Sequence, residues 1–316
     1  MTVNFREEQA KNIRRTWVLI ILLVTLAVLC GYAFGRGLAG SHEAGLIGVG
    51  IGATFGVVMT LVAVYAGGSM VLAFSRAHEL TSVTDDDERR LTNAVEEMAI
   101  ASGLPRPRIF LIETEACNAF ACGRNPRNAA VAATRGLIKK LDRNELQAVI
   151  GHEMGHIRNY DILFTVVVAI MVGVIVMMAD MFRNALWYGG AGRHSSSNSK
   201  DNSQMVWLLI GILLSILAPL FAMMLQYAVS REREYLADAT SVELTRNPNA
   251  LASALEKVAG SVHLGGHALD NRGLAHLYIV NPIKGASGTT DSVFATHPPM
   301  QKRIERLRAM AHSTGA

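Results

Sequence analysis

The chain of 316 residues has little of what stabilises small secreted proteins or binds nucleic acids. Its 3 cysteines, an odd number without regular spacing, exclude a disulfide framework and a cysteine-rich structural zinc site. Charged residues make up only 18% of the chain and hydrophobic residues 50%, too few charges to cover an ordinary water-soluble surface. The 30 basic and 26 acidic residues form no dominant basic block, so no nucleic-acid partner is expected. The apolar excess must therefore be collected in a few segments.

Four long runs without charged residues contain this apolar excess. They cover residues 17–34, 44–75, 162–179 and 202–230. Because a helix needs about 20 residues to cross the hydrocarbon core, we predict four transmembrane helices and the lipid bilayer as a partner. The third run is short and has acidic flanks, which leaves open whether the third and fourth runs cross fully. The first run exceeds the about 7–15 apolar residues of a cleaved signal peptide, so we predict an anchor that is retained.

The basic residues around these runs predict the orientation of the chain. Four precede the first run, one lies between the first and second runs, and three follow the second run closely. The positive-inside rule therefore places the N-terminus in the cytosol. We expect four parts: a cytosolic N-terminal segment with two transmembrane helices, the first part of a cytosolic domain, a hydrophobic hairpin with a flexible loop at 189–203, and the second part of the domain. Their ranges are 1–75, 76–161, 162–230 and 231–316.

The polar domain is predicted to be mainly helical with a small sheet. Acidic residues and a capping side chain favour a helix start near Thr84, and Asp142 or Asn144 is expected to cap a second helix. Short apolar segments bounded by turn residues predict three strands. The expected helices cover residues 84–101, 141–160 and 300–310, and the expected strands 108–112, 116–121 and 128–133. Residues 263–293 match no pattern that assigns them a role.

The helix expected at 141–160 carries the strongest chemical signal, a His-Glu-x-x-His motif. His152 and His156 are four residues apart on one helical face, so both can present a ring nitrogen to one Zn²⁺, and Glu153 is placed to take a proton from the attacking water. His263 and His267 have the same spacing. Two glycines between them disfavour a helix, and we interpret them as loop histidines.

A catalytic zinc site needs a third protein ligand and a position open to water. The segment after the fourth apolar run offers two carboxylates, Glu232 and Glu234. Four residues after Glu234, on the same helical face, lies Asp238, which can accept the second ring N–H of a ligating histidine. Glu232 has an apolar residue at that spacing, so we predict Glu234 as the third ligand and Asp238 as its support. Arg231 and Arg233 are expected to anchor the helix at the membrane surface.

Two residues near the C-terminus are further candidates. His297 is a candidate donor for the negative charge that develops on the scissile carbonyl oxygen, and Arg303 is a candidate to neutralise a carboxylate near the site. The alternatives are a loop histidine and a solvated basic helix face.

Three classes of function agree with these residues. The first is a membrane-anchored zinc endopeptidase. The second, an intramembrane metalloprotease, is disfavoured because the motif lies outside the apolar runs and charged residues precede it. The third, a metal-binding membrane scaffold or transporter, has no use for a base at Glu153.

The sequence resembles the HtpX-type membrane metalloproteases of peptidase family M48, over nearly its whole length. The matching features are the two N-terminal apolar runs, the Gly-His-Glu-Met-Gly-His motif, Ser-Arg-x-Arg-Glu-Tyr-x-Ala-Asp at 230–238, and Thr-His-Pro-Pro at 296–299 followed by Arg303 and Ile304. This resemblance implies an α-helical integral membrane protein with a mainly helical α+β, gluzincin-like (zincin) protease domain that carries a small sheet.

The resemblance also implies a zinc metalloendopeptidase that takes part in membrane-protein quality control and the stress response. It implies one Zn²⁺ per chain, held by the residues that match the family's ligands, and substrates that are membrane proteins or unfolded polypeptides. We expect a multi-pass protein of the inner (cytoplasmic) membrane, with the protease domain facing the cytosol. The segment Asn118, Ala119, Phe120 and Ala121 resembles the family's edge strand that aligns the substrate backbone. An alternative for Asn118 is a strand-end residue that bonds its own backbone.

Overall fold

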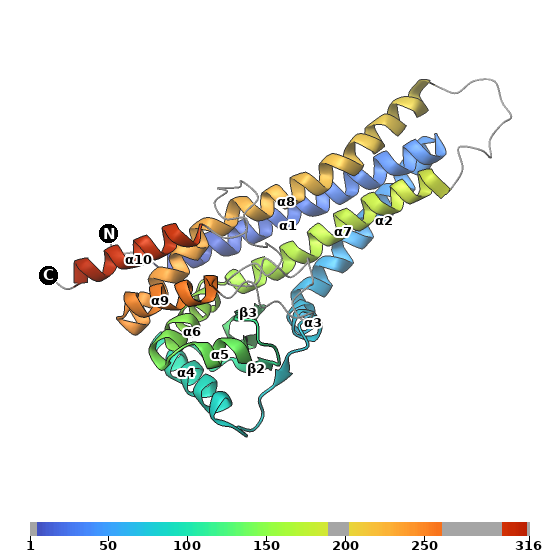
Figure 1. Cartoon of the computed structure of the whole chain (residues 1–316). Coiled ribbons are helices and arrows are strands. Elements are labelled where there is room, and N and C mark those ends of the chain that lie inside the picture. Colours follow the sequence, from blue (N-terminus) through green and yellow to red (C-terminus); the bar gives the residue numbers. More distant parts are fainter. Residues whose placement is uncertain (1–4, 189–201, 261–298, 315–316) are drawn as a thin grey trace. The chain divides into compact units, whose positions relative to one another are not determined.

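A computed structural model describes residues 5–188, 202–260 and 299–314, and most of them are helical (Figure 1). The α-helices are α1 Phe5–Ala39, α2 His42–Tyr65, α3 Gly67–Phe74, α4 Asp86–Ser102, α5 Arg135–Lys140, α6 Arg143–Arg158, α7 Asp161–Tyr188, α8 Asn202–Thr245, α9 Pro248–Ala259 and α10 Met300–Thr314. The strands are β1 His78–Glu79, β2 Arg108–Ile112, β3 Ala119–Gly123 and β4 Ala129–Thr134, with a short 3-10 helix, η1 Pro126–Asn128.

The chain divides into two compact units, and one of them consists of long apolar helices. This helical unit comprises residues 15–63 and 167–226. Among the described residues, four helical segments are long and apolar enough to cross a membrane: Gln9–Ala39, His42–Tyr65, Asp161–Tyr188 and Ser203–Met224. The third of these has the highest mean hydropathy, 3.0, although the sequence marked the corresponding run as the least certain span. The uncharged run 44–75 is not one span, because α2 ends at Tyr65 and α3 belongs to the other unit.

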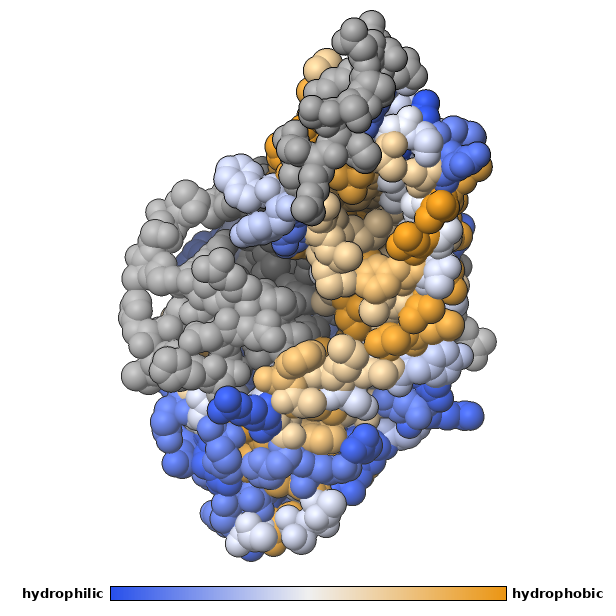
Figure 2. Space-filling view, turned by 90° about the vertical axis from the view of Figure 1, so that its right-hand side faces the viewer, coloured by the Kyte–Doolittle hydropathy of each residue, from blue (hydrophilic) through white to orange (hydrophobic). Residues whose placement is uncertain are grey.

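Small residues bring the helices of this unit close together. A Cβ added at Gly48 in α2 would lie 2.0 Å from the carbonyl oxygen of Gly31 in α1. Phe34 of α1 stacks on Phe182 of α7 with ring centroids 4.2 Å apart. Many large apolar side chains on the long helices are exposed, and Figure 2 shows such residues gathered on one face of the molecule. An exposed apolar surface of this kind suits contact with lipid.

The second unit comprises residues 1–14, 64–166 and 227–316 and contains the sheet. It therefore includes the start of α1, which lies in the expected cytosolic N-terminal segment, and all of α3, which lies in the second uncharged run. The strand order is β1-β2-β4-β3, with β2 and β4 parallel and the other pairs antiparallel. Strand β3 begins at Ala119, three residues after the start of the strand expected at 116–121. The core lies between the sheet and α4, α6, α9 and α10; among its fully buried residues are Leu91, Val131, Leu146, Leu255 and Leu307.

The helices of this unit begin at the side chains that cap them. Asp85 accepts a hydrogen bond from the backbone N–H of Glu88 and starts α4. Asp142 starts α6 with a capping box, in which its side chain accepts from the N–H of Glu145 at 2.9 Å and its own N–H donates to the Glu145 carboxylate at 2.8 Å. Of the two caps that the sequence allowed for the motif helix, the structure shows Asp142.

The close contact of α1 and α2 gives a prediction with an internal control. Gly48→Ala places a methyl group against the Gly31 carbonyl and should lower the free energy of unfolding by about 1–3 kcal/mol. Gly50→Ala, where nothing lies within 4 Å of the added atom, should be neutral or stabilising. Thermal unfolding of both variants in detergent measures the difference. Equal melting temperatures would contradict the described packing of α1 on α2.

Candidate metal centre

The motif helix α6 lies unusually close to the second part of α8, which follows the fourth apolar run. A Cβ added at Gly155 would lie 3.1 Å from Cα of Ala237, and one at Gly151 would lie 3.2 Å from the hydroxyl of Ser241. Ser241 donates a hydrogen bond to the carbonyl of Ala148 at 2.6 Å. The two glycines of the motif therefore permit a close helix contact that even a Cβ would tighten, and this contact brings the carboxylates of α8 to α6.

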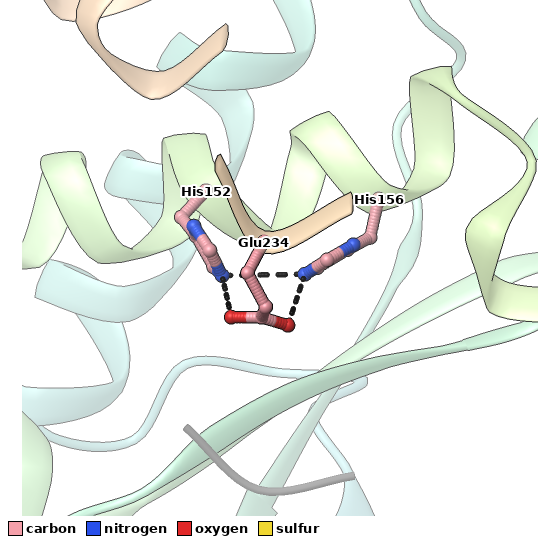
Figure 3. A group of neighbouring side chains, drawn as sticks. All are labelled: His152, His156 and Glu234. Atoms are coloured by element: carbon pink, nitrogen blue, oxygen red, sulfur yellow. Dashed lines mark hydrogen bonds and ion pairs between the residues drawn. The ribbon is translucent and has the colours of Figure 1, made fainter. Parts of the chain in front are cut away.

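Three side chains from these two helices point at one spot (Figure 3). Nε2 of His152 and Nε2 of His156 are 3.2 Å apart. The two carboxylate oxygens of Glu234 lie 3.6 Å from one nitrogen each. One ligand atom from each residue lies within 4.8 Å of the others. The structure thus brings together the three residues that the sequence selected as metal ligands.

The opposite nitrogens of both imidazoles face carboxylates. Nδ1 of His152 lies 3.0 Å from Oδ1 of Asp238, and Nδ1 of His156 lies 3.2 Å from Oδ2 of Asp161. A carboxylate only accepts hydrogen bonds at neutral pH, so each Nδ1 carries a proton, and in the neutral imidazole that a metal binds each Nε2 presents its lone pair. Both histidines therefore have the tautomer that a metal ligand requires.

The geometry of these atoms fits a tetrahedral metal ion. Two imidazole nitrogens bound to one such ion at about 2.0–2.1 Å lie about 3.3 Å apart, close to the 3.2 Å between the two Nε2 atoms. Two nitrogens and one carboxylate also form a donor set typical of catalytic zinc sites, which keep a fourth position for water. His152, His156 and Glu234 are therefore the residues that would hold the ion.

A single buried arginine joins the carboxylates of this cluster. Arg303 of α10 is fully buried and makes a two-pronged contact with Asp238, from Nε at 2.9 Å and from Nη2 at 2.6 Å. Its Nη1 lies 3.1 Å from Oε2 of Glu234. Arg303 thus reaches the metal-site carboxylates that the sequence analysis proposed for it, rather than a solvated helix face.

Burial and charge together shift the pKa values of this cluster. Burial lowers the pKa of His156, but the hydrogen bond to Asp161 and the charge of Glu234 outweigh it and raise the pKa to about 9. Burial raises the pKa of Asp238, but the charge of Arg303 and the hydrogen bond from His152 outweigh it and lower the pKa to about 2. In the metal-free protein a proton on His156 therefore competes with a cation for the same space.

Glu153 lies on α6 beside the ligands and is buried. Its surroundings include β3, which α6 contacts. Burial raises the pKa of Cys122 in β3 to about 12, and the charge of Glu153 adds to this rise while Arg108 opposes it. The proposed base thus lies near both the ligands and the strand that the sequence singled out for substrate.

The remaining predicted site residues have mixed outcomes. His297 lies outside the described residues, as do all of residues 263–293, which include the two loop histidines. Asn118 is buried, and its side-chain oxygen accepts a hydrogen bond from the backbone N–H of Ala119 at 3.0 Å, as in the structural alternative given for it. The side chains of Ala119, Phe120 and Ala121 are buried as well, which leaves only their backbone for a substrate.

Arg233 corrects one expectation, and Asp161 is a residue that the sequence analysis missed. Arg233 is buried, its guanidinium lies 3.4 Å from the ring centroid of Phe164, and its Nη1 is 3.8 Å from Asp161. It is therefore not an anchor at the membrane surface. In the sequence, Asp161 is only an acidic flank of the third apolar run, and because α6 ends at Arg158, helical spacing does not relate it to His156.

Comparison with known proteins agrees with this site. Residues 85–311 match the family described as Peptidase family M48. A protein named Protease HtpX homolog from Streptococcus pneumoniae (strain Hungary19A-6) is 42% identical over 306 residues, which cover 96% of this chain and 99% of that protein. One of the same name from Ligilactobacillus salivarius (strain UCC118) is 41% identical over 304 residues, with the same coverage. A crystal structure of S. mikatae Ste24p matches 79% of this chain and 56% of that chain, with 20% identity and a TM-score of 0.47.

The chain therefore belongs to peptidase family M48, and within it to the HtpX-type proteases. The resemblance identified from the sequence is confirmed. With its four apolar helices and its mixed sheet, the protein is a multi-pass, membrane-anchored metalloprotease with the predicted fold class.

Proposed function

We propose that the protein is a zinc-dependent endopeptidase with one Zn²⁺ per chain. The observation that carries this proposal is the convergence of the two Nε2 atoms and the carboxylate of Glu234, with both Nδ1 atoms facing carboxylates. When bound, Zn²⁺ polarises a water molecule and the scissile carbonyl. Glu153, one step round the helix from His152, takes the proton of the attacking water and passes it to the leaving amine.

The substrate is proposed to bind along the outer edge of β3. The backbone N–H of Thr134 in β4 donates to the carbonyl of Asn118. In this antiparallel pair the backbone N–H and C=O groups of even-numbered β3 residues therefore bond to β4, and those of odd-numbered residues are directed away from it. The N–H of Ala119 is already bonded to Asn118, and Gly123 at the end of β3 lies close to Gly68 of α3, so the N–H of Ala121 is the central donor directed away from β4. A peptide that adds to a sheet edge as an extra strand is held by hydrogen bonds to its backbone, so a site of this kind accepts many peptide sequences.

The Glu153→Gln variant tests the catalytic proposal. Glutamine keeps the shape of the side chain but takes up no proton, so kcat for an unstructured peptide should fall about 10²-fold or more while the zinc content stays unchanged. Zinc content by mass spectrometry and peptide cleavage in detergent measure the two effects. Cleavage at the wild-type rate by Glu153→Gln would rule out this mechanism.

Two further substitutions serve as matched controls for this experiment. Glu234→Gln should lose both zinc and activity, because it removes the anionic ligand. Glu232→Gln, two residues away on the same helix and exposed, should keep both. Equal zinc loss in these two variants would overturn the choice of ligand.

Proline substitutions test the substrate edge. Ala121→Pro removes the N–H directed away from β4 and should lower kcat/KM for an unstructured peptide about 2- to 10-fold, the equivalent of one hydrogen bond, with zinc retained. Ala119→Pro should affect peptide binding less, because its N–H is already used by Asn118. An unchanged kcat/KM in a folded, zinc-loaded Ala121→Pro protein would remove β3 from the binding site.

The cellular setting is proposed from the charge bias of the sequence and from the family. The basic residues around the first two spans support an inner (cytoplasmic) membrane protein whose protease unit faces the cytosol. A broad, backbone-based substrate site in a membrane-anchored protein supports the cleavage of membrane-protein or unfolded polypeptide substrates in quality control. Cleavage by an intramembrane metalloprotease is the alternative, and a cut inside a substrate's transmembrane segment would favour it.

Cysteine labelling tests this orientation. The three native cysteines are buried, so single exposed cysteines can be introduced with little background. Ser82→Cys, in the protease unit, should be protected from a membrane-impermeant thiol reagent in intact cells, and Ser41→Cys, between the first two spans, should react. The reverse pattern would place the protease unit outside the cell.

A further inference from the structure

The first helix contacts the C-terminal end of the metal helix α6 through two polar residues that precede its uncharged run at 17–34. Gln9 of α1 donates a hydrogen bond to the carbonyl of Arg158 at 2.7 Å, and Asn12 donates to the carbonyl of Asn159 at 3.2 Å. These carbonyls belong to the C-terminal end of α6, where helix carbonyls have no partner within the helix. Residues three apart lie on the same face of α1, so both amides meet the end of the metal helix together.

Asn12 also contacts the carboxylate that orients a metal ligand. Its side chain is 4% exposed, and its Nδ2 donates to Oδ1 of Asp161 at 3.0 Å. The other oxygen of Asp161 faces Nδ1 of His156 at 3.2 Å. A continuous path of polar contacts therefore runs from α1 through Asp161 to the imidazole of His156.

The backbone between α6 and α7 explains why this carboxylate needs to be held. Tyr160 has φ = 60°, in the left-handed region, and this residue reverses the chain so that the first residue of α7 returns toward α6. The guanidinium of Arg233 also lies near the same oxygen. Its Nη1 is 3.8 Å from Oδ1 of Asp161, beyond hydrogen-bond distance. Asn12 therefore makes the shorter contact with Oδ1 and sets the rotation of the carboxylate.

We propose that Asn12 is a positioning residue of the metal centre: it fixes Asp161, and through Asp161 the ring of His156, so that the N-terminal segment of the chain is a structural part of the protease site. This inference rests on the proposed zinc site. Its expected effect is smaller than that of a residue in direct contact with a ligating histidine, which typically changes metal affinity about 10- to 100-fold.

The experiment measures the loss of Zn²⁺ from the full-length protein in detergent to a chromogenic chelator. Asn12→Leu keeps the side-chain volume but donates no hydrogen bond, and it should speed zinc loss about 3- to 10-fold. Gln9→Met removes the neighbouring contact with α6 without touching Asp161, and Ile13→Ala changes an exposed residue of the same helix. Both controls should lose zinc at the wild-type rate. Asn12→Ala replaces Asn12→Leu if the latter does not fold.

A double-mutant cycle separates this role from a general effect on folding. In an Asp161→Ala background, Asn12→Leu should add nothing, because the residue through which it acts is gone. A further acceleration of the same size in that background would overturn the proposal, as would equal effects of Asn12→Leu and Gln9→Met. If the wild-type protein holds zinc and Asn12→Leu loses it no faster, only this inference fails. A wild-type protein that binds no Zn²⁺ would overturn the proposed function as well.

Discussion

The structure of the protease unit depends on the balance of charge in one buried cluster. Isolated buried carboxylates are very unfavourable, so a group of them persists only with positive charge beside it. The buried carboxylates are Glu153, Asp161, Glu234 and Asp238, and the buried arginines beside them are Arg233 and Arg303. Among these described residues, with neutral histidines, four carboxylates and two arginines leave two negative charges, which one divalent cation would balance. The elevated pKa of His156 has the same cause, since a proton partly supplies the missing charge in the metal-free protein.

Close packing of two helices turns this charge balance into a defined site. Gly151 and Gly155 allow α8 to approach α6 at contact distance, and the hydroxyl of Ser241 bonds to the α6 backbone there. One turn of α8 then presents Glu234 to the histidines, and the next presents Asp238 to the back of His152. The glycines of the motif therefore support the geometry, because a Cβ at either position would make a tight contact of 3.1–3.2 Å with α8 and push the two helices slightly apart.

The sequence predicted those features that follow from spacing within one helix. The two histidines, the cap at Asp142 and the pairing of Glu234 with Asp238 are all set by three- or four-residue spacing, and the structure brings each of them into place. Asp161 could not be found in this way, because the left-handed turn at Tyr160 decides where its carboxylate points. The burial of Arg233 was missed for a related reason. A basic residue next to an apolar run usually meets the membrane surface, and only the tertiary fold shows that an aromatic ring and a carboxylate cover it.

The metal centre depends on contacts between parts of the chain that are very distant in sequence. Asn12 and Asp161 are 149 residues apart, and Arg303 and His152 are 151 apart. Contacts of such separation form late, because the entropy of closing a long loop must be overcome before they stabilise anything. The helices that carry Asn12, Asp161 and Glu234 also continue, as single helices, into three of the four apolar segments. The residues of the metal centre therefore come together only when the chain from Asn12 to Arg303 is present and these helices are formed, because Arg303 of α10 contacts both Glu234 and Asp238 of α8.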